Sequence, residues 1–189
     1  FARFGLRLSA SDMRYSCMVN PETGERCMDE SLGRQAMTDN CLAVYHSGAK
    51  RFPIAVLDQV GVDHFDDPLR TARQAKLGYL TKYESLEALA KAERIPFEAL
   101  KKSIDRYNEL IAKCKDEDFG KDFAKVDFLP IQKAPFYASE VLPVSNRGMG
   151  GVLITPRAEV LDMTGKVIPG LYAAGEAASG VHGNMSLIS

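Results

Sequence analysis

The stretch that decides the fold is Ile168-Pro-Gly-Leu-Tyr-Ala-Ala-Gly-Glu-Ala-Ala-Ser-Gly-Val-His-Gly183, in the last third of the chain. Its first residues predict a turn at 168–170 and then a short apolar strand at 171–174. The Ala-Ala-Gly run lets a backbone or a ligand approach closely, because almost no side chain is in the way. Glu176 then places a carboxylate at the C-terminal end of a buried strand, where open α/β sheets bind ligands. A strand-to-loop turn with an ordinary surface glutamate fits the same residues.

The sequence around this stretch resembles a known family. In order and with similar spacing, the chain carries Met149-Gly-Gly-Val152, Ala158-Glu-Val-Leu161, residues 168–176 and Gly180-Val-His-Gly183. Together these segments resemble the C-terminal signature of the flavoprotein subunits of fumarate reductase and succinate dehydrogenase. The most similar branch is the soluble FAD-dependent ene-reductases, which include flavocytochrome c fumarate reductase and urocanate reductase.

The resemblance implies an α+β fold with two parts. Residues 1–133 are expected to form an α/β substrate-capping domain. Residues 134–189 are expected to form the β-rich C-terminal portion of a Rossmann-like FAD-binding domain. No Gly-x-Gly-x-x-Gly follows a strand in these residues, so the half of that domain with the dinucleotide fingerprint is absent from them.

The composition excludes several classes of protein. The chain has 189 residues, of which 46% are hydrophobic and 26% charged, as in an ordinary globular protein. The formal net charge of −1 gives no electrostatic reason to expect nucleic acid or an anionic membrane as a partner. No apolar run approaches the roughly 18 residues of a membrane span. Because the chain begins at Phe1 and ends within a motif, we interpret it as a piece of a longer protein.

The cysteines and histidines predict neither a cluster nor a metal site. The four cysteines show no Cys-x-x-Cys spacing, so we expect free thiols in a reducing compartment, which favours the cytoplasm and leaves the periplasm open. A disulfide between Cys17 and Cys27 across a hairpin is the alternative. His46, His64 and His182 are too widely spaced to suggest metal ligands.

The N-terminal part contains the candidate catalytic residue. Residues 15–28 predict a β-hairpin around an Asn-Pro-Glu-Thr-Gly turn. Apolar residues then recur at helical spacing, so Arg34 is expected to begin a helix, at the end where the helix dipole disfavours a cation. In the ene-reductases, an arginine about four residues past an acidic pair is the proton donor. The resemblance therefore assigns this role to Arg34, which has that spacing from Asp29-Glu30. A solvated surface arginine is the alternative.

The middle of the chain predicts scaffold. Residues 52–57 form a short apolar run that indicates a buried strand. Ser85 is a good N-cap for a short helix. Residues 96–114 predict the clearest helix, and its apolar stripe consists of Leu100, Ile104, Tyr107, Ile111 and Cys114. Residues 116–125 predict a charged loop in which lysines accompany the acids, so no metal site is expected there. Strands are expected at 136–144, 152–155 and 158–163, with a hairpin turn at 164–166.

Cofactor and substrate residues are implied by the resemblance, position by position. The residues expected to contact FAD are Gly150, Gly151, Ala174, Gly175, Glu176, Leu187 and Ile188. Arg147 is at the place of a substrate-binding histidine and His182 belongs to the C-terminal signature. Ser186 replaces an arginine that clamps a substrate carboxylate in the family. Loss of that bidentate contact removes on the order of 1.5–3 kcal/mol, which favours a monocarboxylate or another activated alkene over fumarate.

The function implied is reduction of the C=C bond of an α,β-unsaturated carboxylate, with hydride from N5 of FAD and a proton from Arg34. The expected partners are the small unsaturated acid and the remainder of the polypeptide or an electron-donor domain. Two alternatives stay open. One is a non-catalytic, cap-like binding module, and the other is a flavin dehydrogenase that works in the oxidative direction.

Overall fold

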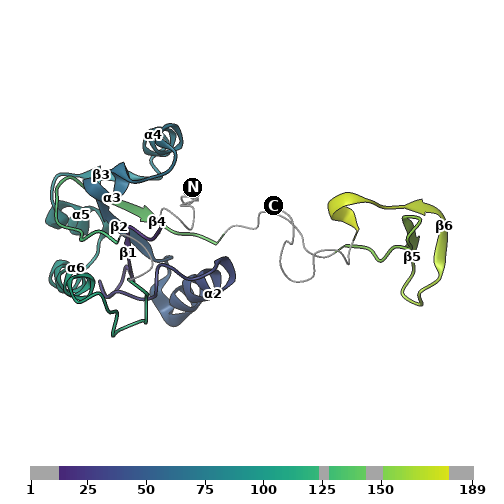
Figure 1. The fold of residues 1–189 in the computed structure, drawn as a ribbon, viewed down its shortest axis with the longest axis horizontal. Helices are drawn as coiled ribbons and strands as arrows, with labels where there is room; N and C mark the ends of the chain where they lie inside the picture. Colours follow the sequence, from purple (N-terminus) through teal and green to yellow (C-terminus); the bar gives the residue numbers. More distant parts are fainter. Residues whose placement is uncertain (1–12, 124–127, 144–150, 179–189) are drawn as a thin grey trace. The chain divides into compact units, whose positions relative to one another are not determined.

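The computed structural model describes residues 13–123, 128–143 and 151–178. The chain folds as two compact units, Phe1–Pro143 and Val144–Ser189, and each is described by itself (Figure 1). The elements of the N-terminal unit are β1 (Cys17–Val19), α2 (Arg34–Val44), the π-helical turn η1 (Tyr45–Ala49), β2 (Ile54–Asp58), α3 (Gln59–Asp63), α4 (Pro68–Lys76), β3 (Thr81–Tyr83), α5 (Leu86–Glu93), α6 (Phe97–Ala112) and β4 (Phe136–Glu140).

The N-terminal unit is built on an antiparallel sheet with the strand order β1-β2-β4-β3. In the centre of the sheet, Val56 of β2 lies opposite Cys17 of β1 on one side and Ala138 of β4 on the other. All five residues of β2 are buried, which confirms the strand predicted from the apolar run at 52–57. The predicted hairpin at 15–28 is confirmed by the bridge between Val19 and Arg26.

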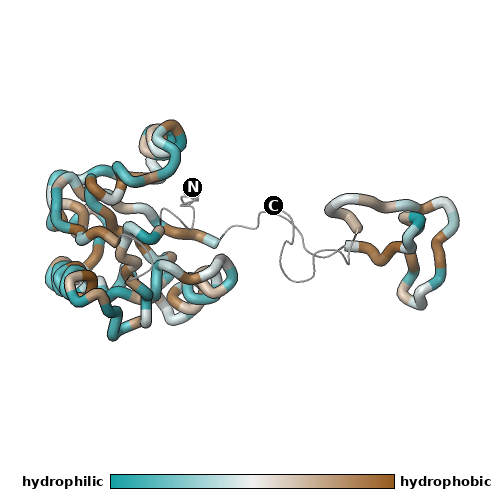
Figure 2. Tube along the Cα trace, in the orientation of Figure 1, coloured by the Kyte–Doolittle hydropathy of each residue, from teal (hydrophilic) through white to brown (hydrophobic). Residues whose placement is uncertain are grey.

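Helices cover both faces of this sheet, and alternate residues of each strand point to opposite faces. One core cluster contains Cys17, Val56 and Ala138 and packs against α5 and α6. The second contains Met18 and Leu57 and packs against α2 and the segments around α3 and β3. In Figure 1, α5 and α6 lie on one side of the sheet and α2 on the other, and Figure 2 shows hydrophobic segments concentrated along the strands between them.

The helix predictions hold with one correction. Ser85 caps α5 by accepting a hydrogen bond from the Ala88 N–H at 3.0 Å. The buried residues of α6 include Leu110, whereas Cys114, predicted as the last member of the apolar stripe, is exposed. The reason is that α6 ends at Ala112, and the backbone of Cys114, with φ of 51°, is no longer helical.

The two units divide later in the chain than the predicted boundary near residue 133. The strand β4 belongs to the first unit, because it pairs with β2 along its whole length and with β3 on its other edge. The buried carboxylate of Asp58 also joins this region, since it accepts hydrogen bonds from the N–H groups of Gln132 and Lys133 at 2.9 Å each. Which unit is a cap and which belongs to an FAD-binding domain stays a prediction.

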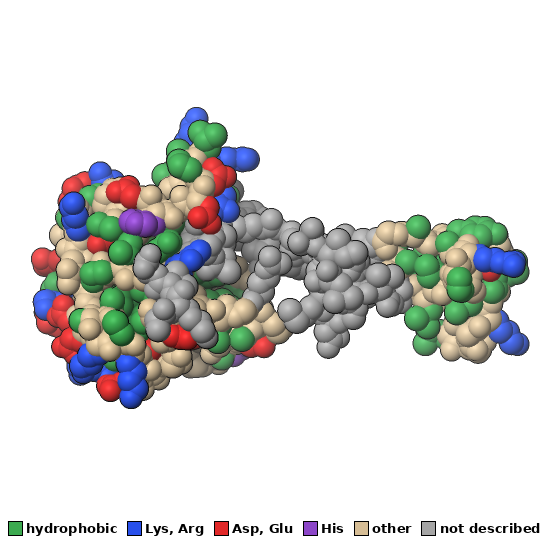
Figure 3. All heavy atoms as spheres, viewed as in Figure 1, with side chains coloured by type: hydrophobic (Ala, Val, Ile, Leu, Met, Phe, Trp, Pro, Cys, Tyr) green, Lys and Arg blue, Asp and Glu red, His purple; other side chains and the backbone are tan. Residues whose placement is uncertain are grey.

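The C-terminal unit is a small antiparallel hairpin of β5 (Glu159–Leu161) and β6 (Val167–Tyr172), followed by the 3-10 turn η2 (Gly175–Ala177). The predicted turn at 164–166 joins the two strands. The strand predicted at 171–174 begins earlier, and β6 is exposed along its whole length rather than buried. The reason is that a two-stranded hairpin has a single partner strand and cannot enclose its own side chains. Figure 3 shows hydrophobic side chains over much of the visible face of this unit.

Candidate functional site

Arg34 is the first residue of α2, as the sequence predicts. The residue before it, Gly33, occupies the N-cap position with an extended backbone (φ −64°, ψ 159°) and has no side chain that could cap the helix. The first turn of α2 also has no acidic residue to balance the positive end of the helix dipole. The start of α2 therefore has none of the usual local stabilisation, and its position depends on contacts on either side.

Four residues before Arg34, the carboxylate of Glu30 is fully buried and accepts four hydrogen bonds. The donors are the Met18 N–H at 3.0 Å, Nε of Arg26 at 2.9 Å, Nη2 of Arg26 at 2.9 Å and Nζ of Lys121 at 3.0 Å. These donors come from β1, from the hairpin after it and from the loop after α6. Glu30 thus joins the N-terminal hairpin to Lys121, which is 91 residues further along the chain.

Two more polar groups complete this buried charge cluster. Asp116 accepts a hydrogen bond from Nη2 of Arg26 at 2.8 Å and three more from backbone N–H groups of its own loop. Nζ of Lys121 also donates to the Tyr107 hydroxyl at 2.8 Å. The guanidinium of Arg26 lies 5.0 Å from the centre of the Tyr107 ring, at cation–π distance. We call Arg26, Glu30, Asp116, Lys121 and Tyr107 together the charge cluster.

The charges within the charge cluster balance, and the pKa values reflect this. Burial by itself raises the pKa of Glu30, but Lys121 and Arg26 bring it below its ordinary value. Burial likewise opposes ionisation of Asp116, yet its hydrogen bond from Arg26 holds its pKa below the ordinary value. For Lys121, burial dominates and lowers the pKa in spite of Glu30. Both carboxylates are therefore ionised at neutral pH.

Sequence reasoning did not find the charge cluster. It predicted a charged loop at 116–125 and did not predict that Asp116 and Lys121 are buried. The only local signal was the acidic Glu30 four residues after Arg26, which outside a helix carries no structural information. Lys121 is 91 residues away from Glu30, so its pairing follows from the tertiary fold.

In the C-terminal unit, two of the predicted cofactor-binding segments lie side by side. A Cβ atom added to Gly151 would lie 2.5 Å from the carbonyl oxygen of Ala177, and the next residue, Val152, donates its N–H to that oxygen at 3.0 Å. Residue 151 must therefore be glycine because another backbone packs against it. Gly175 has a φ of +68°, and a Cβ atom there would meet nothing within 4 Å.

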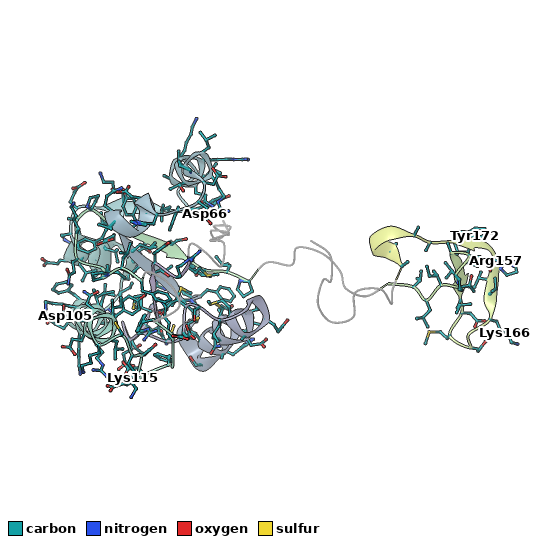
Figure 4. The ribbon with its side chains drawn as sticks, in the orientation of Figure 1. Asp66, Asp105, Lys115, Arg157, Lys166 and Tyr172 are labelled. Atoms are coloured by element: carbon teal, nitrogen blue, oxygen red, sulfur yellow. The ribbon has the colours of Figure 1, made fainter. Side chains whose placement is uncertain are left out.

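Several predicted site residues lie outside the described part of the chain, namely Arg147, Gly150, His182, Ser186, Leu187 and Ile188. Figure 4 labels Lys166 and Tyr172 on the hairpin that precedes Ala174 and Gly175, and Arg157 just before that hairpin. In the ranges 13–123, 128–143 and 151–178, no group of three or more His, Cys, Asp or Glu side chains could hold a metal ion. No helix within these same ranges is long and apolar enough to cross a membrane.

The four cysteines are free thiols, so the alternative of a disulfide between Cys17 and Cys27 is wrong. Burial raises the pKa of both of these thiols well above the ordinary value and raises that of Cys41 to about 11. Because the thiolate is the reactive form, these three side chains are inert at neutral pH. Thiol chemistry is therefore not part of the candidate site.

Comparison with known protein families matches residues 12–189 to the FAD binding domain family. The chain belongs to the FAD-binding domain family. It is 34% identical over 173 residues to the acrylate reductase flavoprotein subunit of Shewanella woodyi, covering 89% of this chain and 33% of that protein. It is 39% identical over 139 residues to a fumarate reductase (cytochrome) of Shewanella frigidimarina, covering 68% and 24%.

A third relative of the chain is the urocanate reductase of Eggerthella lenta, 30% identical over 166 residues, with 85% of the chain and 26% of that protein covered. Among solved structures, the open conformation of a flavocytochrome c3 fumarate reductase aligns with a TM-score of 0.76 and 32% identity, covering 94% of the chain and 30% of that structure. The chain thus spans about a third of the length of these relatives or less.

FAD is the cofactor of this family, and the described backbone fits the approach of such a group. Ala174 and Gly175 are exposed, and they follow directly on the strand β6. A cofactor could therefore lie against the backbone at this point without meeting a bulky side chain. Gly151 offers no such opening on its Cβ side, because the backbone at Ala177 already fills it.

Proposed function

We propose that this protein reduces the C=C bond of an α,β-unsaturated carboxylate with FAD as cofactor. The observation that carries the proposal is that relatives named acrylate, fumarate and urocanate reductase align with 89%, 68% and 85% of this chain. All three names describe reduction of a double bond conjugated to a carboxylate. In this proposal the N-terminal unit is the substrate-capping domain and the C-terminal unit is part of the FAD-binding domain.

When bound in its reduced form, FAD would supply a hydride to the β-carbon of the substrate, and the expected electron-donor domain would then reduce the flavin again. Negative charge then develops on the α-carbon and its carboxylate, so the site needs cations that converge there. Arg34 is the proposed donor of the proton that the α-carbon takes up, and solvent returns a proton to Arg34 afterwards. A guanidinium ordinarily keeps its proton, but a strongly basic carbanion can remove it. Hydride and proton together give the saturated acid.

The remaining predicted residues divide between substrate and cofactor. Arg147, His182 and Ser186 are proposed to surround the substrate carboxylate. A neutral serine leaves a second carboxylate without a bidentate partner, which costs about 1.5–3 kcal/mol, or a factor of about 10–150 in binding. This supports a monocarboxylate substrate, and the name of the acrylate reductase relative points the same way. The residues proposed to contact FAD are Gly150, Gly151, Ala174, Gly175, Glu176, Leu187 and Ile188.

The test is single-turnover oxidation of the reduced, FAD-loaded protein by acrylate, by fumarate and by ferricyanide. Ferricyanide accepts electrons without a proton donor, so it reports on the flavin alone. Arg34→Ala should slow oxidation by acrylate about 100-fold or more and leave oxidation by ferricyanide unchanged. Arg73→Ala, which removes an exposed arginine on α4, is the matched control and should change neither rate.

The substrate class is tested in the same experiment with Ser186→Arg, which should raise the rate with fumarate relative to acrylate by about 10-fold or more. Protein that binds FAD but is oxidised by neither acid would end the proposal. Unchanged acrylate turnover in Arg34→Ala would remove the assigned proton donor.

A further inference from the structure

The charge cluster has a feature that an ordinary stabilising ion pair does not need. Its central carboxylate, Glu30, is held from both sides of the N-terminal hairpin and from the loop after α6, and it lies only four residues before the start of α2. A buried ionic network is in general a weak source of stability, because the cost of removing charges from water offsets their attraction. Such a network nevertheless permits only one arrangement of its partners. The structure therefore suggests a role in placing the segment between Glu30 and α2.

The segment from Glu30 to α2 is a short path with two fixed ends. Immediately beside Glu30, Oδ1 of Asp29 accepts hydrogen bonds from the N–H and the hydroxyl of Ser31 at 2.7 and 2.6 Å, so the chain turns at once. Beyond Arg34, the side chain of Met37 is buried in the second core cluster. Between these two anchors the described side chains are exposed or half-buried, and the helix start has no cap of its own.

The two anchors differ in kind. Met37 packs in an apolar cluster that includes Met18 and Met28, whose flexible side chains adapt to small shifts. Glu30 is fixed by four directional hydrogen bonds. The hydrogen bonds of Glu30 therefore constrain the backbone position of Arg34 more than the packing of Met37 does.

We propose that Glu30, held by Arg26 and Lys121, is the positioning residue for Arg34. This proposal rests on the proposed function, in which Arg34 donates the proton. Within the charge cluster, two cations face two carboxylates, so its internal charge is balanced. It can then fix the backbone at Arg34 without needing the charge of Arg34 for its own balance.

The test is a double-variant cycle in the FAD-loaded protein with Glu30→Gln, Arg34→Ala and the two combined. Misplacing a reacting group by about an ångström costs up to about 100-fold, so Glu30→Gln should lower kcat with acrylate by about 10–100-fold at nearly unchanged KM. Oxidation by ferricyanide should not change. Because Glu30 acts through Arg34, the combined variant should be no slower than Arg34→Ala alone. The solvent deuterium isotope effect on kcat should rise in Glu30→Gln, since proton transfer becomes slower.

Matched and milder variants complete the test. Glu84→Gln makes the same chemical change at an exposed side chain and should leave kcat unchanged. Lys121→Met leaves Glu30 paired with Arg26, so it serves if Glu30→Gln does not fold, and it should lower kcat several-fold with the same isotope signature. Full additivity in the combined variant, or unchanged kcat in both cluster variants, would overturn the positioning role alone. Full turnover in Arg34→Ala would overturn the proton-donor assignment as well.

Discussion

The charge cluster predicts an asymmetry between its two central partners that can be measured as stability. Glu30→Gln removes the one carboxylate that Lys121 contacts among the residues that the structure describes, and Lys121 then has two neutral acceptors there, the Tyr107 hydroxyl and the Arg14 carbonyl oxygen. Lys121→Met instead leaves Glu30 with both bonds from Arg26 and one from a backbone N–H. The first change leaves a buried cation uncompensated, and the second leaves a carboxylate that is still paired.

The directions of the pKa shifts of Glu30 and Lys121 decide how much stability each of the two variants should lose. The surroundings favour the charged form of Glu30, because the nearby cations outweigh the effect of burial. They disfavour the charged form of Lys121, because burial outweighs its attraction to Glu30. Removing the carboxylate of Glu30 leaves the buried charge of Lys121 without its partner, and breaking a buried pair in this way costs about 3–5 kcal/mol of stability. Replacing Lys121 by the similarly sized Met removes a costly buried charge together with its hydrogen bonds, so the loss should not exceed about 2 kcal/mol.

The assay is urea unfolding at neutral pH, followed by far-ultraviolet circular dichroism, for the parent chain and the two variants. The midpoint should fall with little change in slope, because the surface exposed on unfolding is nearly the same. The control is Glu84→Gln, which breaks an exposed pair with Lys82 at 3.8 Å and should change the free energy of unfolding by about 0.5 kcal/mol or less. A loss in Lys121→Met as large as that in Glu30→Gln would refute the reasoning.

Two further predictions concern pH and backbone geometry. Burial alone would raise the pKa values of Glu30 and Asp116, but Arg26 and its neighbours lower both, so the unfolded chain binds more protons in acid than the folded chain does. The free energy of unfolding should therefore fall as the pH drops below about 4, and it should fall less in Glu30→Gln. Urea unfolding across that pH range measures both. Gly24→Ala should lower the stability of the chain, measured by calorimetry, more than Gly78→Ala does. The two glycines have φ angles of +74° and +73°, so backbone strain costs each substitution about 1–2 kcal/mol. Of the two positions, only Gly24 would also place its new Cβ atom 2.9 Å from the backbone of α6. Equal losses would contradict this.

Local patterns were enough for those elements that depend on near neighbours. The beginning of α2 at Arg34, the cap of α5 by Ser85 and the turn at 164–166 were all predicted from a few adjacent residues. Each depends on helical periodicity or on a side chain that bonds to the backbone within four residues. The apolar run at 52–57 likewise predicted a fully buried strand, since both of its faces are hydrophobic.

The errors arose where the answer depended on distant parts of the chain. The sequence predicts a strand at 136–144, but no local pattern reports that β4 lies between β2 and β3. The strand before Ala174 was expected to be buried because it is apolar, yet β6 is exposed in its unit. Whether an apolar strand is covered depends on a partner surface, which composition does not specify.

By itself, the sequence determined the order of most elements and the family resemblance, because periodicity, capping and motif spacing are written in adjacent residues. The role of Arg34 as proton donor follows from that resemblance and stays a prediction. Only the tertiary structure showed that Asp116 and Lys121 are buried, with Asp116 paired to Arg26 and Lys121 paired to Glu30. The physical reason is that a charged side chain stays in water unless a partner of opposite charge is brought to it. For Glu30 and Lys121, that partner comes from 91 residues away, and only the folded sheet and helices bring the two together.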